Sequence, residues 1–429
     1  MNGGSITAAR RSPRRRGTVF GHRDFRLLWI GETTSSLGAN ISRLTAPIIA
    51  VGTLRADTFT VSVLAAMGWL PWLVIGLPAG AWVDRLARRP LMIVCNLVSA
   101  SVLLTVPVAV LAGALTIGHL LVVTVLTGTA TVFFQTAYQV YLPSVVNAAD
   151  FPAANSALQG SESVTRIAGP SLAGLLTQVA GAVTGLVADA ASFLVSTACL
   201  VFNRAEDRPS GDADRTRALR REISEGLRFV AADPYLRVLT VFGATSNLVL
   251  TGQSTILIVF LTREMNLGPA TVGLLVSGTS VGGALGAAGA GFLARRLGTA
   301  RALLFAELGA APFALLTPMA GRGAGLLCVL VGGAGVGAGI VIGNVLKNSF
   351  RQTYTPRHLQ GRVLVTMQFL NYGTIPLGTV LSGVLGTTLG LRPTLWVTAA
   401  GLVLASLVLL TGPIRRHRDL PTSEAHHGQ

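Results

Sequence analysis

Two stripes of polar and charged side chains interrupt segments that are otherwise apolar. The first stripe has the spacing i, i+4, i+8 and i+11 and consists of Glu32, Ser36, Asn40 and Arg43. The second has the spacing i, i+4, i+7 and i+11 and consists of Asn155, Gln159, Glu162 and Arg166. Each spacing places the four side chains on one face of a helix. Charges inside an apolar helix need a cavity, a partner or, for an acid, a proton. The pattern therefore indicates either substrate binding and proton transfer, or polar groups that only fasten helices together.

The spacing also predicts which of these charges pair. Glu162 and Arg166 are one helical turn apart and are expected to pair directly. Glu32 and Arg43 lie about 16 Å apart along a helix, so they are not expected to pair. An acid without a fixed partner is suited to carry a proton, which makes Glu32 the first candidate and Glu162 the second. Asp189 and Glu307 are interpreted as lone carboxylates, with a structural and a functional role equally open.

The sequence lacks the residue patterns of an enzyme, a metal site or an ATP-hydrolysing loop. Its six histidines lie in tails, loops or the edges of apolar segments, so no catalytic cluster is expected. The three cysteines are isolated and have no metal-ligand spacing. Lys347 is the sole lysine, and Asn348 follows it where a Walker A loop requires serine or threonine. We therefore expect no cofactor and no bound metal.

The composition indicates that the stripes belong to membrane-spanning helices. Of 429 residues, 51% are hydrophobic and only 12% are charged, and the mean hydropathy is +0.60. A helix needs about 20 mostly apolar residues to span a bilayer, and none of the apolar segments alternates like a barrel strand. The predicted spans are 26–54, 61–83, 90–114, 117–142, 154–179, 181–203, 236–262, 268–293, 300–320, 324–347, 361–388 and 393–413. We predict an all-α polytopic membrane protein with twelve transmembrane helices.

The arginines predict the orientation of the chain. The formal net charge is +16, from 34 basic and 18 acidic residues. With even crossings, the outer connections carry only Arg55, Arg263, Arg322 and Arg392. Because basic residues stay on the cytoplasmic side, both termini are expected in the cytoplasm of a multi-pass protein of the cell membrane. A basic chain also suggests nucleic-acid binding, but charges that lie between apolar segments argue against that partner.

A polar stretch divides the chain into two halves. The predicted units are a basic cytoplasmic tail (1–24), a six-helix half (25–203), a cytoplasmic linker (204–234), a second six-helix half (235–413) and a cytoplasmic tail (414–429). The linker has apolar residues at helical spacing, which are Leu219, Ile223, Leu227 and Val230. This spacing predicts an amphipathic helix on the inner membrane surface, although a solvated linker explains it equally well.

The sequences of the two halves are similar at several positions. One loop contains a recognisable motif. The sequences at 141–143 (YLP) and 354–356 (YTP) correspond. The loop after the second span contains Gly80, Asp84, Arg85, Arg88 and Arg89, which resemble the pattern G-x-x-x-D-R-x-G-R-R. The eighth span is followed by a partial copy, in which Arg295 replaces the aspartate. Over residues 25–413 the chain therefore resembles the major facilitator superfamily of transporters, in which two six-helix halves repeat each other.

Shorter sequences resemble one subgroup, the macrolide-exporter-like and enterobactin-exporter-like drug:proton antiporters. They lie at 25–29, 35–38, 166–174, 360–363 and 376–378. This resemblance implies proton-coupled efflux of a drug, an antibiotic or a siderophore by alternating access. Relatives often have aspartate where this chain has Asn40, so one proton carrier is missing here. Arg43 and Glu162 match no pattern of the subgroup and are interpreted as specific to the substrate of this protein.

The resemblance also implies a central cavity lined by the first, fourth, seventh and tenth spans, with the fifth contributing. The expected transport site consists of Glu32, Arg43, Gln139, Glu162, Arg166, Asn247 and Asn344. Further lining residues are Phe134, Gln135, Tyr138 and Gln253. In the loop motif, Asp84 is expected to dock near the start of the eleventh span and steady the outward-open state, since a helix N-terminus favours a carboxylate.

Glycines recur every four residues in two spans. They are Gly278, Gly282 and Gly286 in the eighth span, and Gly335, Gly339 and Gly343 in the tenth. Small residues at this spacing let helices approach closely. Static packing and sliding contact during transport are both consistent with the pattern.

Two other functions fit the same fold. One is an importer or uniporter of a small metabolite, and the other is a membrane sensor or scaffold that does not transport. The buried charges argue against the sensor, because they cost stability if nothing uses them. The expected partners are a small-molecule substrate, protons and the lipid bilayer, and the protein is expected to be a monomer.

Overall fold

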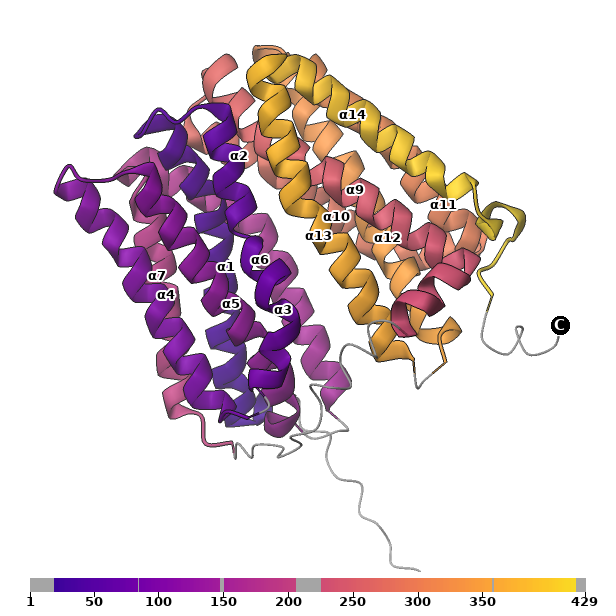
Figure 1. Ribbon diagram of the computed structural model, residues 1–429, viewed down its shortest axis with the longest axis horizontal. Helices are drawn as coiled ribbons and strands as arrows, with labels where there is room; N and C mark the ends of the chain where they lie inside the picture. The colour runs from indigo at the N-terminus through magenta and orange to yellow at the C-terminus, as the bar shows by residue number, and fades with distance from the viewer. Residues whose placement is uncertain (1–18, 84, 147–149, 206–224, 357–358, 422–429) are drawn as a thin grey trace, which may run out of the picture.

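The computed structural model describes residues 19–83, 85–146, 150–205, 225–356 and 359–421, which form two groups of helices side by side (Figure 1). The first group consists of α1 (Arg23–Gly52), α2 (Thr58–Met67), α3 (Leu70–Val83), α4 (Arg88–Leu111), α5 (Ile117–Val145), α6 (Phe151–Ala180) and α7 (Thr184–Phe202). The second consists of α9 (Pro234–Val259), α10 (Pro269–Leu297), α11 (Thr299–Ala310), α12 (Leu327–Tyr354), α13 (Gln360–Thr388) and α14 (Leu391–Leu407).

Some helices combine into one pass across the membrane. α2 and α3 form a single pass that is broken at Gly68 and Trp69, because Pro71 has no backbone N–H to continue the helix. A π-helical turn (Phe260–Glu264) extends α9, and a 3₁₀ helix (Ala311–Met319) extends α11. Counted in this way, the described residues make twelve passes, six in each group. The predicted all-α fold with two six-helix halves is confirmed.

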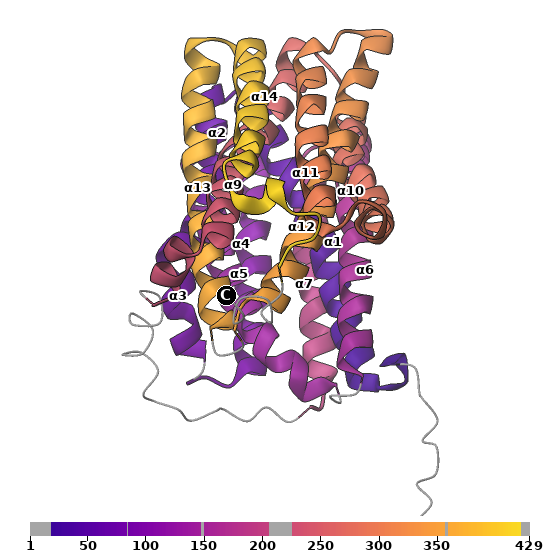
Figure 2. The ribbon, with the colours of Figure 1, turned by 90° about the vertical axis from the view of Figure 1, so that its right-hand side faces the viewer.

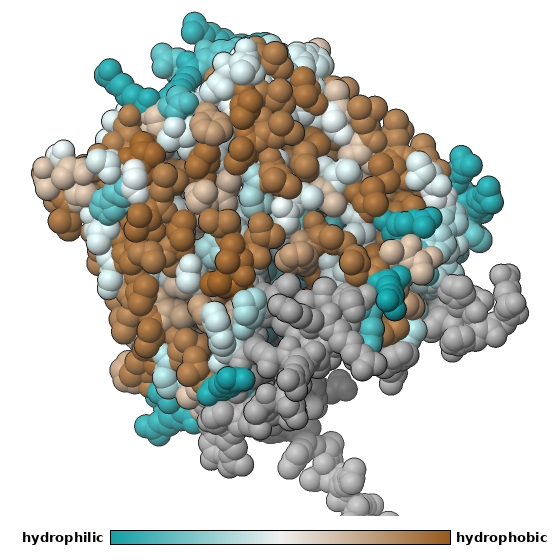
Figure 3. Space-filling view, viewed as in Figure 1, coloured by the Kyte–Doolittle hydropathy of each residue, from teal (hydrophilic) through white to brown (hydrophobic). Residues whose placement is uncertain are grey.

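The apolar character differs among these passes. In the described part of the chain, nine passes are long and apolar enough to span a membrane, judged by length and composition. The three that fall short are α1, α6 and α13, and the first two carry the predicted polar stripes. Around the passes, the visible face of the molecule is largely apolar, with hydrophilic residues toward its rims (Figure 3). Exposed apolar side chains such as Val108, Leu111, Val179 and Leu285 suit contact with lipid.

The two halves touch from the middle of the bundle to one end. We call the end where α7 stops and α9 starts the linker end, and the opposite end the far end. Between α6 and α10, the hydroxyl groups of Ser171 and Ser277 are 2.7 Å apart. The Ser280 hydroxyl donates to the carbonyl oxygen of Arg166 at 2.9 Å.

A second contact between the halves lies at the far end. α2 packs against α13, where Gly383 lies close to Ser62. The Arg263 side chain, in the π-helical turn after α9, donates to the carbonyl oxygen of Ala56. Toward the linker end the ribbons of the two halves diverge (Figure 1).

The glycine stripes fasten α12 to a helix on each of two sides. The stripe of α10 faces the backbone of α12, so that a side chain at Gly282 would overlap the carbonyl of Ala334. The stripe of α12 faces α11 and its extension, with Gly339 against Ala310 and Gly343 against Glu307. Both contacts lie within the second half, so the stripes hold three neighbouring helices together and do not join the halves.

Near the linker end, each half has a tyrosine that is hydrogen-bonded within that half. The Tyr141 hydroxyl donates to Oδ1 of Asn203, after α7, at 3.1 Å. The Tyr354 hydroxyl donates to Oδ2 of Asp233, before α9, at 2.6 Å. Each tyrosine is therefore bonded to a residue of its own half, but the two partners flank different passes, the last of the first half and the first of the second.

The predicted amphipathic helix of the linker is described only in part. Residues 225–232 are helical, with Val230 buried and Leu227 exposed. Leu219 and Ile223 lie outside the described residues.

The C-terminal tail returns to the start of α11 and caps it (Figure 2). Oδ1 of Asp419 accepts the backbone N–H of Thr299 at 2.8 Å, and the N–H of Leu420 donates to the Thr299 hydroxyl at 2.8 Å. The N–H of Ala300 donates to the carbonyl oxygen of Arg418 at 3.1 Å. The first N–H groups of a helix have no partner within the helix, so the tail supplies what a capping side chain would.

Replacing the capping acid should destabilise the second half. Asp419→Ala removes the acceptor for the N–H of Thr299 and is expected to lower the free energy of unfolding by about 1 kcal/mol. Thermal unfolding of the purified protein in detergent measures this change. Asp419→Asn keeps an oxygen acceptor and should lose less, and equal melting temperatures for all three proteins would contradict the capping role.

Candidate functional site

In the first half, the Glu32 carboxylate is only partly satisfied. Nε2 of Gln135, on α5, donates to Oε1 of Glu32 over a long 3.5 Å. Oε2 of Glu32 is buried and has no hydrogen-bond partner among the described residues, and the same holds for the Tyr138 hydroxyl. A buried polar atom without a partner is costly, so this oxygen favours a proton, a water molecule or a ligand donor.

The predicted pairing of Glu162 with Arg166 is confirmed. Nη2 and Nε of Arg166 lie 2.5 Å and 3.1 Å from Oε1 of Glu162, one helical turn away on α6. The Glu162 side chain is 40% exposed and the Arg166 side chain 62% exposed, although both lie in the middle of a membrane pass. The pair lies next to the contact between α6 and α10, because Ser280 of α10 donates to the carbonyl oxygen of Arg166. Its exposure leaves it available to a ligand.

Arg43 has no hydrogen bond or ion pair with any described residue, and its side chain is exposed. The charged groups that act electrostatically on its guanidinium are those of Arg166, Glu162 and Asp189. Glu32 and Arg43 do not pair with each other, as their separation along α1 predicts.

Other polar residues of the first stripe fasten α1 to α6. The Ser36 and Thr165 hydroxyls are 3.0 Å apart, and Nδ2 of Asn40 donates to the carbonyl oxygen of Ser36 at 2.8 Å. Gly169 of α6 packs against the Asn40 side chain. These contacts leave Ser36 and Asn40 as packing residues between two helices.

Asp189 is not a lone carboxylate. It is buried on α7 against Gly38 of α1, and the Ser192 hydroxyl donates to its Oδ1 at 3.3 Å. Asp189 therefore has a hydrogen-bond partner on its own helix and packs closely against α1.

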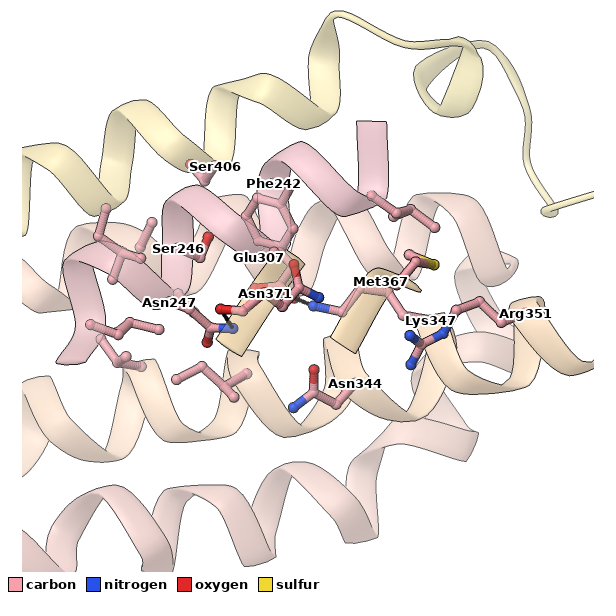
Figure 4. A pocket seen from close by; sticks show the side chains of 18 residues that line it. Phe242, Ser246, Asn247, Glu307, Asn344, Lys347, Arg351, Met367, Asn371 and Ser406 are labelled. Carbon is pink, nitrogen blue, oxygen red and sulfur yellow. Dashed lines mark hydrogen bonds and ion pairs between the residues drawn. The ribbon is translucent and has the colours of Figure 1, made fainter. Parts of the chain in front are cut away.

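In the second half, a pocket brings two predicted residues together (Figure 4). Residues of α9, α11, α12, α13 and α14 line it, among them the predicted Asn247 and Asn344. Nδ2 of Asn247 donates to the carbonyl oxygen of Asn371 at 3.3 Å, and Asn344 is exposed. The pocket therefore presents amide groups from α9, α12 and α13.

The same pocket holds an ion pair that the sequence analysis missed. Nζ of Lys347 lies 2.8 Å from Oε1 of Glu307, which corrects the interpretation of Glu307 as a lone carboxylate. The Lys347 ammonium also lies 4.8 Å from the centre of the Phe242 ring. The signal that was available is composition, since Lys347 is the sole lysine of the chain and falls in an apolar segment.

Two further predicted lining residues lie apart from this pocket. Gln139 is exposed on α5 and does not line it. Gln253 is buried on α9, and its Oε1 has no hydrogen-bond partner among the described residues.

The loop motif, which contains Gly80, Asp84, Arg85, Arg88 and Arg89, is hydrogen-bonded through Arg89 to α7 of the first half. Nε and Nη2 of Arg89 donate to the carbonyl oxygens of Leu200 and Val201, at 2.8 Å and 2.6 Å. These carbonyls belong to the last turn of α7, where a cation is favourable. Arg88 is buried, Arg85 is exposed, and a side chain on Gly80 would meet nothing. Asp84 lies outside the described residues.

Twelve helical passes in two six-helix halves are the architecture of the major facilitator transporters. The model of one family, described as "Transmembrane secretion effector", matches residues 18–428. The chain therefore belongs to this family of the major facilitator superfamily.

The relatives and structural neighbours agree with this assignment. The chain is 31% identical over 373 residues to the multidrug efflux pump Tap of Mycolicibacterium fortuitum, covering 84% of this chain and 88% of that protein. It is 29% identical over 372 residues to the Tap protein of Mycobacterium tuberculosis, covering 84% and 86%.

Among solved structures, a variant of the nucleoside transporter NupG has a TM-score of 0.74 at 14% identity, covering 90% of this chain and 99% of that one. A bacterial homologue of the iron transporter ferroportin, in its inward-facing state, has a TM-score of 0.71 at 15% identity, covering 91% and 98%. At these identities the likeness shows the fold alone.

Filling the space at Gly343 should disturb the ion pair. Gly343→Ala would place a methyl group onto the Glu307 carboxylate, and overpacking of this kind costs about 1–3 kcal/mol. We expect a lower melting temperature in detergent and reduced transport. Gly289→Ala on α10 is the matched control, because a side chain there meets nothing, and it should leave both properties unchanged. Equal effects of the two substitutions would contradict the close fit.

Proposed function

We propose that the protein is a secondary active exporter, which moves small amphipathic organic molecules out of the cell in exchange for protons. The observation that carries this proposal is the Glu32 carboxylate, with one buried oxygen that lacks a partner among the described residues. Its other oxygen accepts only the long hydrogen bond from Gln135. A buried and weakly satisfied carboxylate is suited to take up and release a proton as its surroundings change.

The direction and the substrate class rest on the relatives. Two proteins named multidrug efflux pump Tap align with 84% of this chain. Their names support efflux of drug-like molecules here, as the subgroup resemblance of the sequence also does.

The proposed transport site draws on both halves. The first half contributes Glu32, Arg43, Gln139, Glu162 and Arg166, and the second contributes Asn247 and Asn344. In this proposal, Glu32 carries the proton, and Glu162 is the second candidate. Arg43 is proposed as a substrate contact, because the residue is exposed and has no ion pair with any described residue.

Alternating access would exchange one set of contacts between the halves for another. The halves touch through α6 with α10 and through α2 with α13, from the middle to the far end. The bond between Ser171 and Ser277 joins two neutral hydroxyls, whose net worth is about 1 kcal/mol, so it can open and close reversibly. Asp84 would dock at the start of α13 when the linker end closes, and would steady that outward-open state.

The proposal places the linker end in the cytoplasm of a monomeric protein in the cell membrane. The arginine distribution supports it, since the connections at the far end carry few basic residues. The state with the halves apart at the linker end is then open to the cytoplasm.

Neutralising Glu32 tests the coupling. Glu32→Gln mimics the protonated acid, so it should abolish efflux against a gradient but retain downhill exchange of substrate. Cells with and without the protein are loaded with a panel of drugs and siderophores, and accumulation is measured. Wild-type protein should lower accumulation of at least one compound, and Glu32→Gln should not. Exchange is measured in proteoliposomes.

Glu264→Gln is the matched control. Glu264 lies in the π-helical turn after α9, is half-exposed and is paired with Arg392 of α14. Concentrative efflux by Glu32→Gln would move the coupling role to Glu162 or Asp189. Increased accumulation would favour an importer, and binding without any flux would favour a sensor.

Cysteine labelling tests the orientation. In a chain with Cys95, Cys199 and Cys328 replaced by alanine, Ala114→Cys at the far end should react with a membrane-impermeant maleimide added to intact cells. Asp214→Cys in the linker should react only after the membrane is opened. The reverse pattern would overturn the proposed orientation.

A further inference from the structure

The pocket of the second half has an excess of positive charge. Its ionisable lining residues are Glu307, Lys347 and Arg351, which give a formal net charge of +1. Lys347 and Arg351 lie one helical turn apart on the same face of α12. Lining residues from the neighbouring helices add amide, hydroxyl and apolar groups, but no second acid. Arg351 lies in the last turn of α12, so the excess positive charge is at the linker end of the pocket.

Arg351 has unused donor capacity in this wall. One of its terminal nitrogens donates to Oδ1 of Asn348 on the same helix. Its Nε is buried and has no hydrogen-bond partner among the described residues. A guanidinium offers five N–H donors and matches the geometry of carboxylate and phosphate groups.

Lys347 has unused capacity as well. An ammonium group has three N–H donors, and the described residues supply one acceptor, Oε1 of Glu307 at 2.8 Å. Glu307 is nearly fully buried and is held in place by Gly343, so it fixes the position of the Lys347 ammonium. An anion can therefore contact Lys347 without displacing Glu307.

We propose that this pocket binds an anionic group of the transported molecule, a carboxylate or a phosphate, on Lys347 and Arg351, with Glu307 positioning Lys347. This inference rests on the proposed function, because it names the chemical class of the substrate. The apolar part of such a molecule would lie against Phe242, Val336 and Ile340, which line the same pocket. The substrate is then an amphipathic molecule with at least one negative charge.

Benzoate and its neutral isostere benzamide test this assignment. The full-length protein is purified and placed in phosphatidylcholine nanodiscs, where no anionic lipid competes. Thermal unfolding is followed while each compound is titrated. Benzoate is expected to raise the melting temperature in a saturable way, since a ligand that binds only the folded state stabilises it, whereas benzamide should not. Equal effects of the two compounds, or none, would overturn the proposal.

Two substitutions separate anion binding from a structural role of the ion pair. Lys347→Gln should weaken benzoate binding roughly ten-fold, which is the usual loss for one charged hydrogen bond. Glu307→Gln keeps an oxygen that accepts from Lys347, so Lys347 stays in position, and it raises the formal charge of the pocket from +1 to +2. It should therefore tighten benzoate binding. A pair that only fastens α11 to α12 predicts the same loss in both variants, and that result would overturn the proposal. Arg301→Gln, an exposed charge change on α11, is the matched control and should bind benzoate as the wild type does.

Two further arms complete the experiment. If Lys347→Gln does not fold because Glu307 is left unpaired, the double variant Glu307→Gln/Lys347→Gln removes both charges of the pair and should bind benzoate as weakly as Lys347→Gln is expected to. Nanodiscs that contain phosphatidylglycerol test a lipid headgroup as the source of the anion. Stabilisation by phosphatidylglycerol without any by benzoate would overturn the assignment to a substrate. Binding is measured without a gradient, so its failure leaves the efflux test unaffected.

Discussion

Placing a charge in a membrane is costly, and this cost governs where the charged residues of the protein lie. Ionised side chains at the centre of a bilayer cost several kcal/mol, so a chain keeps them there only with partners or water. This protein pairs Glu162 with Arg166 and Glu307 with Lys347. Most of its other charges lie near the ends of the passes, where arginines such as Arg89 bind the final carbonyls of a helix.

The two halves meet this constraint in different ways. In the first half the charges are spread over α1 and α6 and are incompletely matched, with Arg43 exposed and one oxygen of Glu32 unpartnered among the described residues. In the second half the ion pair is enclosed by five helices and backed by a glycine. A loosely matched carboxylate can change its protonation more easily than one held in an ion pair, which agrees with the proposed proton transfer at Glu32. The anionic group is proposed for the second half because Lys347 and Arg351 keep unused N–H donors there.

Packing gives the halves their rigidity and leaves the contact between them adjustable. Close approach at Gly282 and Gly339 locks α10, α12 and α11 into one unit. Between the halves, by contrast, the polar contacts include a pair of serine hydroxyls and an arginine bonded to a backbone carbonyl. Each such contact is worth only about 1–3 kcal/mol, so the halves can separate as rigid bodies without unfolding.

Features that depend on local periodicity could be predicted from the order of the amino acids alone. Twelve apolar segments predicted the twelve passes, and a spacing of four residues predicted the pair of Glu162 and Arg166, because both partners lie on one helix. Which helices contact each other depends on the tertiary structure and could not be predicted from this periodicity. Glu307 and Lys347 are 40 residues apart, and they meet because Gly343 lets α11 and α12 approach closely. The glycine repeat showed that some helix must come close, but helical periodicity carries no information about which helix that is.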